Sequence, residues 1–155
     1  MTDAAIAIPR LLARYADLID AGDFVGAATL FDGGCIVAGG RELRGVDAIR
    51  RLWEDFVQIH ADGTPRTRHL ISNVTIELDA DGDGAACRSQ WTVLQAIGAG
   101  SPQIVGSGRY LDRFIRADGI WRFARREYGP VDFWGDTSAH LKIAPKLRDN
   151  EDGTL

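Results

Sequence analysis

The chain has 155 residues, of which 45% are hydrophobic and 26% are charged, and its formal net charge is −4. This length suits one domain with a core that needs no disulfide or metal for stability, and the charge gives no electrostatic reason to bind nucleic acid or an anionic membrane. The two cysteines, Cys35 and Cys87, lie in apolar or strand-like runs, which favours buried free thiols in a reducing cytoplasm. We find no export signal at the N-terminus and no apolar run near the roughly 18 residues that cross a membrane.

Helical spacing of apolar residues predicts a first helix over about 3–20. On a helical wheel, Tyr15 lies near the centre of the apolar arc, Asp17 lies nearly opposite, and Asp20 lies at the edge of the arc. Asp20 is therefore expected to be half-buried and Asp17 to face solvent. A tight turn and a second, short helix over 24–31 follow.

The rest of the chain predicts strands interrupted by one more helix. A short strand at 35–37 is followed by a candidate return strand, 41–44, and the apolar spacing from Asp47 to His60 predicts the third helix. Turn-forming residues then separate four runs, which predict an antiparallel meander over 69–78, 85–97, 103–116 and 120–129. Helices followed by hairpin-linked strands indicate an α+β domain with helices packed on one face of a curved sheet.

The run 69–78 has apolar residues on both of its faces. Strand alternation puts His69 and Asn73 on one face and Leu70 on the other, yet neither face is free of large apolar residues. Either a second subunit covers the outer face of the sheet, or a bulge near Ser72 changes the register. The first explanation predicts a homodimer through the outer sheet face.

His69 is the candidate catalytic base, because it opens a strand directly after a loop and Asp20 ends a helix that could face it. A neutral imidazole accepts a proton well near pH 7, and a carboxylate that accepts its other N–H fixes the tautomer and stabilises the imidazolium. Tyr15, Tyr110 and Asn73 are candidate donors to an enolate formed by removing a proton next to a carbonyl. Dehydration, isomerisation and aldol-type cyclisation all begin with that step.

Each of these assignments has a structural alternative. His69 could be a partly exposed surface residue, and Asp20 could be a polar helix end. Arg125 and Arg126 must point to opposite faces of a strand, and Arg126 could either enter the pocket or pair with Asp112.

No metal or other cofactor is expected. The run Asp79-x-Asp81-x-Asp83-Gly84 copies the start of a calcium loop, but Gln90 stands where a bidentate glutamate is needed and strands flank the run. This run is predicted to be a hairpin turn.

Several short motifs together resemble, in order, the SnoaL-like branch of the nuclear-transport-factor-like superfamily over roughly 5–130. They are Tyr15 with Asp20, Ala21-Gly22-Asp23-Phe24, Arg66-Thr67-Arg68-His69-x-x-x-Asn73, Gly108-x-Tyr110-x-Asp112 and Asp118-Gly119-x-Trp121-Arg122-Phe123-x-x-Arg126. The resemblance implies a cystatin-like cone, in which a strongly curved, mixed, mostly antiparallel sheet wraps around three N-terminal helices and leaves a pocket open at one end. It also implies one domain over 1–135 with a partly flexible C-terminal tail over 136–155.

Within that superfamily the chain is similar to the scytalone dehydratase and bile acid dehydratase families. The similarity implies catalytic roles for Asp20 and His69, with Tyr15 and Arg126 nearby. The chain has Gln95 where scytalone dehydratase has a second catalytic histidine, and Ala38 or Gly39 where it has a substrate-orienting tyrosine. The same substrate is therefore not expected.

The sequence predicts a cofactor-independent lyase, isomerase or cyclase that acts on a hydrophobic, ring-bearing small molecule, with His69 and Asp20 as the catalytic pair. The alternative is a non-catalytic small-molecule-binding or assembly subunit, like the small subunit of ring-hydroxylating dioxygenases, with 132–155 as an interface arm. The residues expected to contact the ligand are Tyr15, Ile19, Trp53, Phe56, Asn73, Trp91, Tyr110, Phe114 and Arg126.

Overall fold

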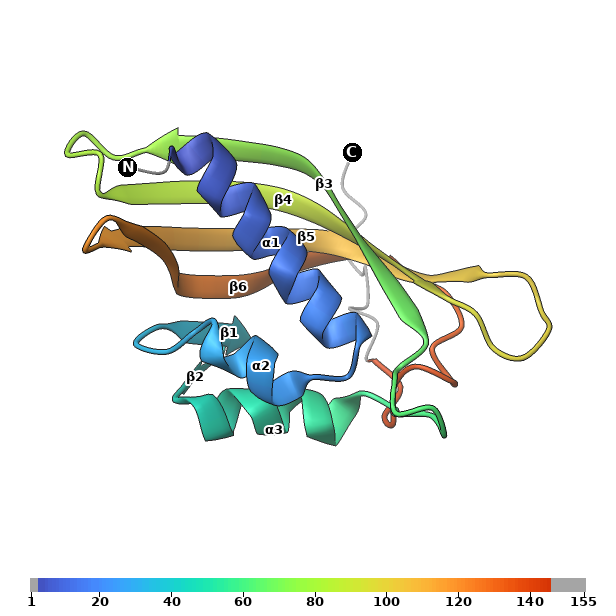
Figure 1. Cartoon of the computed structure of the whole chain (residues 1–155). Helices are drawn as coiled ribbons and strands as arrows, with labels where there is room; N and C mark the ends of the chain where they lie inside the picture. The colour runs from blue at the N-terminus through green and yellow to red at the C-terminus, as the bar shows by residue number, and fades with distance from the viewer. Residues whose placement is uncertain (1–2, 146–155) are drawn as a thin grey trace.

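The computed structural model describes residues 3–145 and contains one mixed sheet with helices on one side of it (Figure 1). The strand order in the sheet is β2-β1-β6-β5-β4-β3, and every neighbouring pair is antiparallel except β1 and β6, which run parallel. The α+β class and the mixed, mostly antiparallel sheet agree with the prediction. The elements are α1 (Ala4–Asp20), α2 (Phe24–Thr29), β1 (Cys35–Ala38), β2 (Arg41–Arg44), α3 (Val46–Phe56), β3 (Thr67–Leu78), β4 (Gly84–Gln95), β5 (Gln103–Ala117) and β6 (Ile120–Trp134).

Helix α1 ends at Asp20 because the next turn needs a glycine. Gly22 has φ +75, and a Cβ at this position would lie 2.6 Å from the carbonyl oxygen of Gly63. The backbone N–H of Asp23 donates to the carbonyl of Leu18 at 2.9 Å, which closes the end of the helix. The helix buries its apolar face against the sheet, and Figure 1 shows it lying along β3.

Strand β3 contains a bulge between Ser72 and Thr75, where Asn73 has φ 52. The bulge puts Ile71 and Ile76 on the same side of the sheet, and both pack against the core. The bulge is therefore the explanation for the apolar residues that simple alternation assigns to both faces. Leu70 of β3 remains exposed on the opposite face, and the homodimer stays a prediction.

Long-range pairing sets two element boundaries that local patterns misplaced. Helix α3 ends at Phe56 instead of continuing towards His60, because Val57 is extended and pairs with Leu141. Strand β6 runs past Pro130 to Trp134, because its pairing with β5 shifts in register around Gly108. The last part of the predicted tail, 146–155, lies outside the described residues. Within residues 3–145 no helix is long and apolar enough to cross a membrane.

The core contains a fully buried ion pair between β5 and β6. Arg126 donates from Nε and Nη2 to the two carboxylate oxygens of Asp112 at 2.9 and 2.7 Å, and both side chains are 0% exposed. The guanidinium lies 4.3 Å from the ring centre of Tyr15 and 3.8 Å from that of Tyr110. Burial acts to lower the pKa of Arg126, but the charge and hydrogen bonds of Asp112 outweigh it and raise that pKa.

We expect the substitution Arg126→Leu to destabilise the fold by about 3–5 kcal/mol, because it leaves the Asp112 carboxylate buried and unpaired. Urea unfolding measures the change in free energy. The double variant with Asp112→Leu should be more stable than the single variant, and Arg125→Leu, which removes only a partly exposed pair with Glu127, should cost less than about 1 kcal/mol. Equal losses in Arg126→Leu and Arg125→Leu would contradict this role of the buried pair.

Candidate active site

Asp20, at the end of α1, lies against the first residues of β3. Nδ1 of His69 is 2.6 Å from Oδ1 of Asp20, and the backbone N–H of His69 donates to Oδ2 at 2.8 Å. The hydroxyl of Thr67 donates to Oδ1 at 2.7 Å. The side chains of His69 and Asp20 are only 8% and 9% exposed. The structure thus brings the two predicted catalytic residues into direct contact.

This contact assigns a different role to each nitrogen of the His69 ring. An ionised carboxylate only accepts hydrogen bonds, so Nδ1 carries the proton that is shared with Asp20. The contact of Nδ1 with Asp20 is the only hydrogen bond of the ring within residues 3–145, so Nε2 makes none there. In the neutral ring, Nε2 therefore presents a lone pair that can accept a proton.

The environment keeps Asp20 ionised although it is an unfavourable place for a carboxylate. The end of a helix carries partial negative charge, which repels the carboxylate. Burial is the largest single influence on the pKa of Asp20 and raises it, but the hydrogen bonds and charge of His69, together with the Thr67 hydroxyl, hold that pKa below 3.8. Asp20 is therefore a charged hydrogen-bond acceptor at neutral pH.

A groove of about 240 Å³ between α1 and β3 reaches His69. Asp17 and Arg68 are its charged residues, and Arg68 is exposed. Asp17 faces solvent, as the helical wheel predicts. The remaining lining is apolar and comes from Pro9, Leu12, Ala13, Ala16, Ile71 and Val74.

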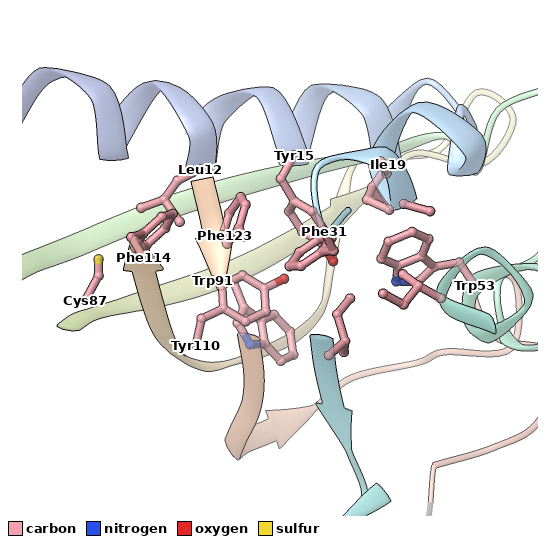
Figure 2. Close-up of a cluster of buried hydrophobic side chains, with 14 of the residues drawn as sticks. Leu12, Tyr15, Ile19, Phe31, Trp53, Cys87, Trp91, Tyr110, Phe114 and Phe123 are labelled. Atoms are coloured by element: carbon pink, nitrogen blue, oxygen red, sulfur yellow. The ribbon is translucent and has the colours of Figure 1, made fainter. Parts of the chain in front are cut away.

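Most of the residues predicted to contact a ligand gather in one aromatic cluster beneath α1 (Figure 2). The ring of Tyr15 makes edge contacts with Trp53 and Tyr110, at centroid distances of 5.9 and 6.0 Å. The hydroxyl of Tyr128 lies 2.9 Å from that of Tyr15 and accepts a hydrogen bond from Nε1 of Trp53 at 2.8 Å. The predicted ligand-contacting residues that are buried here are Tyr15, Ile19, Trp53, Trp91, Tyr110 and Phe114.

Three predicted ligand-contacting residues lie elsewhere or are already engaged. Phe56 is 44% exposed, because the chain leaves helix α3 at the next residue. Asn73 is exposed at the bulge of β3. Arg126 is buried, but its charge is paired with Asp112.

Sequence reasoning missed Thr67, Tyr128 and His140. Strand alternation would have found Thr67 and Tyr128, which lie two residues from His69 and Arg126 on the same faces. No comparable signal marks His140, because it lies in a segment without periodicity after the last strand.

The His140 ring is buried without a hydrogen-bonding partner. The residue is 7% exposed, and no atom within residues 3–145 bonds to its Nδ1. Burial, followed by the charge of His69, lowers the pKa of His140 to about 4. Its imidazole is therefore neutral at physiological pH.

Residues 3–145 hold no group of three or more His, Cys, Asp and Glu side chains that could bind a metal ion. The Asp79 to Asp83 run is the hairpin turn between β3 and β4, as predicted. Both cysteines are buried free thiols.

Comparison with known proteins places the chain among small α+β proteins of one family. Residues 2–127 match the family described as the SnoaL-like domain. A protein of unknown function from Mycobacterium tuberculosis, solved as an aspartate-to-asparagine variant, is 34% identical over 83% of this chain and 76% of its own, with a TM-score of 0.66. No curated protein matches the sequence.

Two similar structures come from Novosphingobium aromaticivorans. A proposed scytalone dehydratase is 25% identical over 84% of this chain and 85% of its own, with a TM-score of 0.64. An NTF2-like protein with a cystatin-like fold is 27% identical over 86% of this chain and 84% of its own, with a TM-score of 0.66.

We expect the folded state to lose stability as the pH falls from 6.5 to about 4. In this range unfolded His140, with an ordinary pKa of 6.5, binds a proton that the folded form excludes down to about pH 4. The loss should be on the order of 3 kcal/mol. Asp20 acts in the same direction at lower pH, because its stabilisation is present above pH 3.8 and is lost as the pH falls through its lowered folded pKa.

Urea unfolding at a series of pH values measures this dependence, and His140→Gln should flatten the curve between pH 6.5 and 4. An unchanged slope in the variant would show that another group is responsible.

Proposed function

Because the chain belongs to the SnoaL-like domain family of the nuclear-transport-factor-like superfamily, we propose that it catalyses cofactor-independent acid–base chemistry on a small, hydrophobic, ring-bearing molecule. The observation that carries the proposal is the buried contact between Asp20 and His69, which leaves Nε2 of His69 without a partner among the described residues. In this proposal the ligand enters the open end of the cone implied for the fold.

The first step is removal of a proton from a carbon next to a carbonyl. Nε2 of His69 takes the proton, the C–H electron pair forms a carbon–carbon double bond, and the carbonyl π pair moves to oxygen. Asp20 stabilises the imidazolium that results, and a base positioned in this way contributes about 10²–10⁴-fold to a rate. The enolate can then expel a hydroxyl group, take a proton at another carbon, or attack a second carbonyl.

Two observations support a hydrophobic ligand and favour dehydration among the three outcomes. The groove that reaches His69 is lined mainly by apolar side chains, which suits a hydrophobic molecule. The proposed scytalone dehydratase from Novosphingobium aromaticivorans is similar over most of both chains. A non-catalytic assembly subunit would have no need for a buried acid–base pair.

Gln95 does not substitute for a second catalytic histidine in this proposal. Its side-chain nitrogen donates to the carbonyls of Pro65 and Ala139 at 2.9 and 3.0 Å. A carboxamide also does not titrate near neutral pH. If the reaction uses a second catalytic side chain besides the Asp20–His69 pair, that side chain belongs to a residue other than Gln95.

We expect the protein to accelerate exchange of the α-protons of 2-tetralone, a ring ketone, for deuterium in D₂O, as followed by proton NMR. His69→Ala should slow the enzyme-dependent exchange at least about 10²-fold, because it removes the base. Asp20→Asn should have an effect of similar size, because the amide can donate to Nδ1 and favour the wrong tautomer.

Asp55→Asn is the control, since it alters an exposed carboxylate on α3, outside the groove that reaches His69, and its rate should equal that of the wild type. If His69→Ala exchanges the ketone as fast as the wild type, His69 is not the base.

We also propose that two chains associate through the outer face of the sheet. After the bulge is taken into account, Leu70, Leu111 and Ile115 remain on the face opposite His69 and are 48%, 39% and 45% exposed. Large apolar side chains that share an exposed sheet face favour burial against a second copy.

Light scattering on the purified protein should therefore give the mass of two 16.9 kDa chains. Leu111→Arg should shift the mass towards one chain, because it places a charge in the interface, whereas Val25→Arg on α2, a residue that is already 57% exposed, should not. A single-chain mass for the wild type would refute the dimer.

A further inference from the structure

Hydrogen bonds hold the backbone of the C-terminal turn, residues 137–141, against the end of α3. The side-chain nitrogen of Gln58 donates to the carbonyls of Ser138 and Leu141, in both cases at 2.7 Å. The backbone N–H of Gln58 donates to the carbonyl of His140 at 2.8 Å. The side chain and the backbone N–H of Gln58 thus hold three carbonyls of the turn in place.

The carbonyl of Ala139 connects the turn to the candidate active site. Ala139 accepts a hydrogen bond from Nε2 of Gln95 at 3.0 Å. Gln95 is the strand partner of Thr67, whose hydroxyl donates to Asp20. Nε2 of His60 is also 3.0 Å from the Ala139 oxygen. The turn is therefore held one strand away from the Asp20–His69 contact.

Nδ1 of the His140 ring has no hydrogen-bonding partner within residues 3–145, although several carbonyls of the turn around it accept hydrogen bonds. A buried polar group without a partner destabilises the fold, and native structures leave few of them. The charges of His69, Asp20 and His60 also act on the pKa of His140. The fold thus places an unsatisfied imidazole beside the candidate active site, and a bound ligand could supply its missing partner.

The protonation state of His140 determines which role it can take. With a pKa of about 4 it is neutral at pH 7, so it offers one N–H and has no spare proton to give as a general acid. A neutral N–H donor is suited to a developing enolate oxygen, which it stabilises without transferring its proton. His69, next to a carboxylate, has the complementary environment for a base.

We propose that His140 is a second catalytic residue, whose ring N–H donates a hydrogen bond to the enolate oxygen while Nε2 of His69 holds the proton taken from carbon. The inference rests on the function proposed above and narrows the substrate to a ring ketone whose carbonyl oxygen can lie next to His140. The proton remains on His69 until it is returned to carbon or to a leaving hydroxyl group.

The test uses the full chain with ¹⁵N-labelled histidine and two probes, 2-naphthol, which carries an enolate-like oxygen on a ring, and naphthalene, which does not. We expect 2-naphthol to shift the ring nitrogen resonances of both His69 and His140, and naphthalene to leave those of His140 unchanged. A shift at His69 alone overturns the role of His140 and leaves the proposed function standing. If neither histidine responds, both proposals fail.

The 2-tetralone exchange assay gives a second readout. His140→Phe keeps a flat ring but removes the donor, and it should slow exchange at least about tenfold, since one oxyanion donor contributes about 10²–10³-fold in other enzymes. His140→Gln should recover part of the rate through its amide N–H, and Ile143→Ala, at a site that is 61% exposed in the same segment, should not alter it. A wild-type rate in either folded His140 variant overturns the inference.

Discussion

The carboxylate of Asp20 joins the C-terminal end of α1 to the first residues of β3 through three hydrogen bonds. Strand β3 is at the edge of the sheet and has β4 as its only strand neighbour among the described residues, so this contact determines where its first residues lie relative to the helix. The same three bonds orient the His69 ring, stabilise the charge on Asp20, and leave Nε2 of His69 available. One buried carboxylate thus serves both the packing of α1 and the proposed chemistry.

The core holds a second buried pair of charged groups, with a different consequence. Arg126 donates two hydrogen bonds to Asp112, both side chains are fully buried, and the rings of Tyr15 and Tyr110 lie against the guanidinium. Neither group is free to exchange a proton, because the guanidinium stays protonated when it is paired in this way. That pair accordingly organises the aromatic cluster, whereas the pair of Asp20 with His69 leaves one nitrogen free to react.

Two buried histidines are placed in contrasting environments. His69 has a carboxylate on one nitrogen, whereas Nδ1 of the buried His140 ring has no partner among the described residues and burial lowers the pKa of His140 to about 4. When two titratable groups of an active site lie in such different environments, one commonly acts as the base and the other as a neutral hydrogen-bond donor. The C-terminal turn is part of this arrangement, because Gln95 and Gln58 fix its backbone and so determine where His140 lies.

The sequence by itself determined the features that depend on neighbouring residues. Helical spacing in 3–20 put Asp20 at the edge of the buried face of α1 and Asp17 in solvent, and the turn formers located the hairpins of the antiparallel strands. Only the tertiary structure decided the contact of Asp20 with His69, the bulge at Asn73, the end of α3 at Phe56 and the position of His140. The reason is physical: periodicity reports which face of an element is buried, whereas these features depend on groups that lie far apart in the chain and meet only when the elements pack.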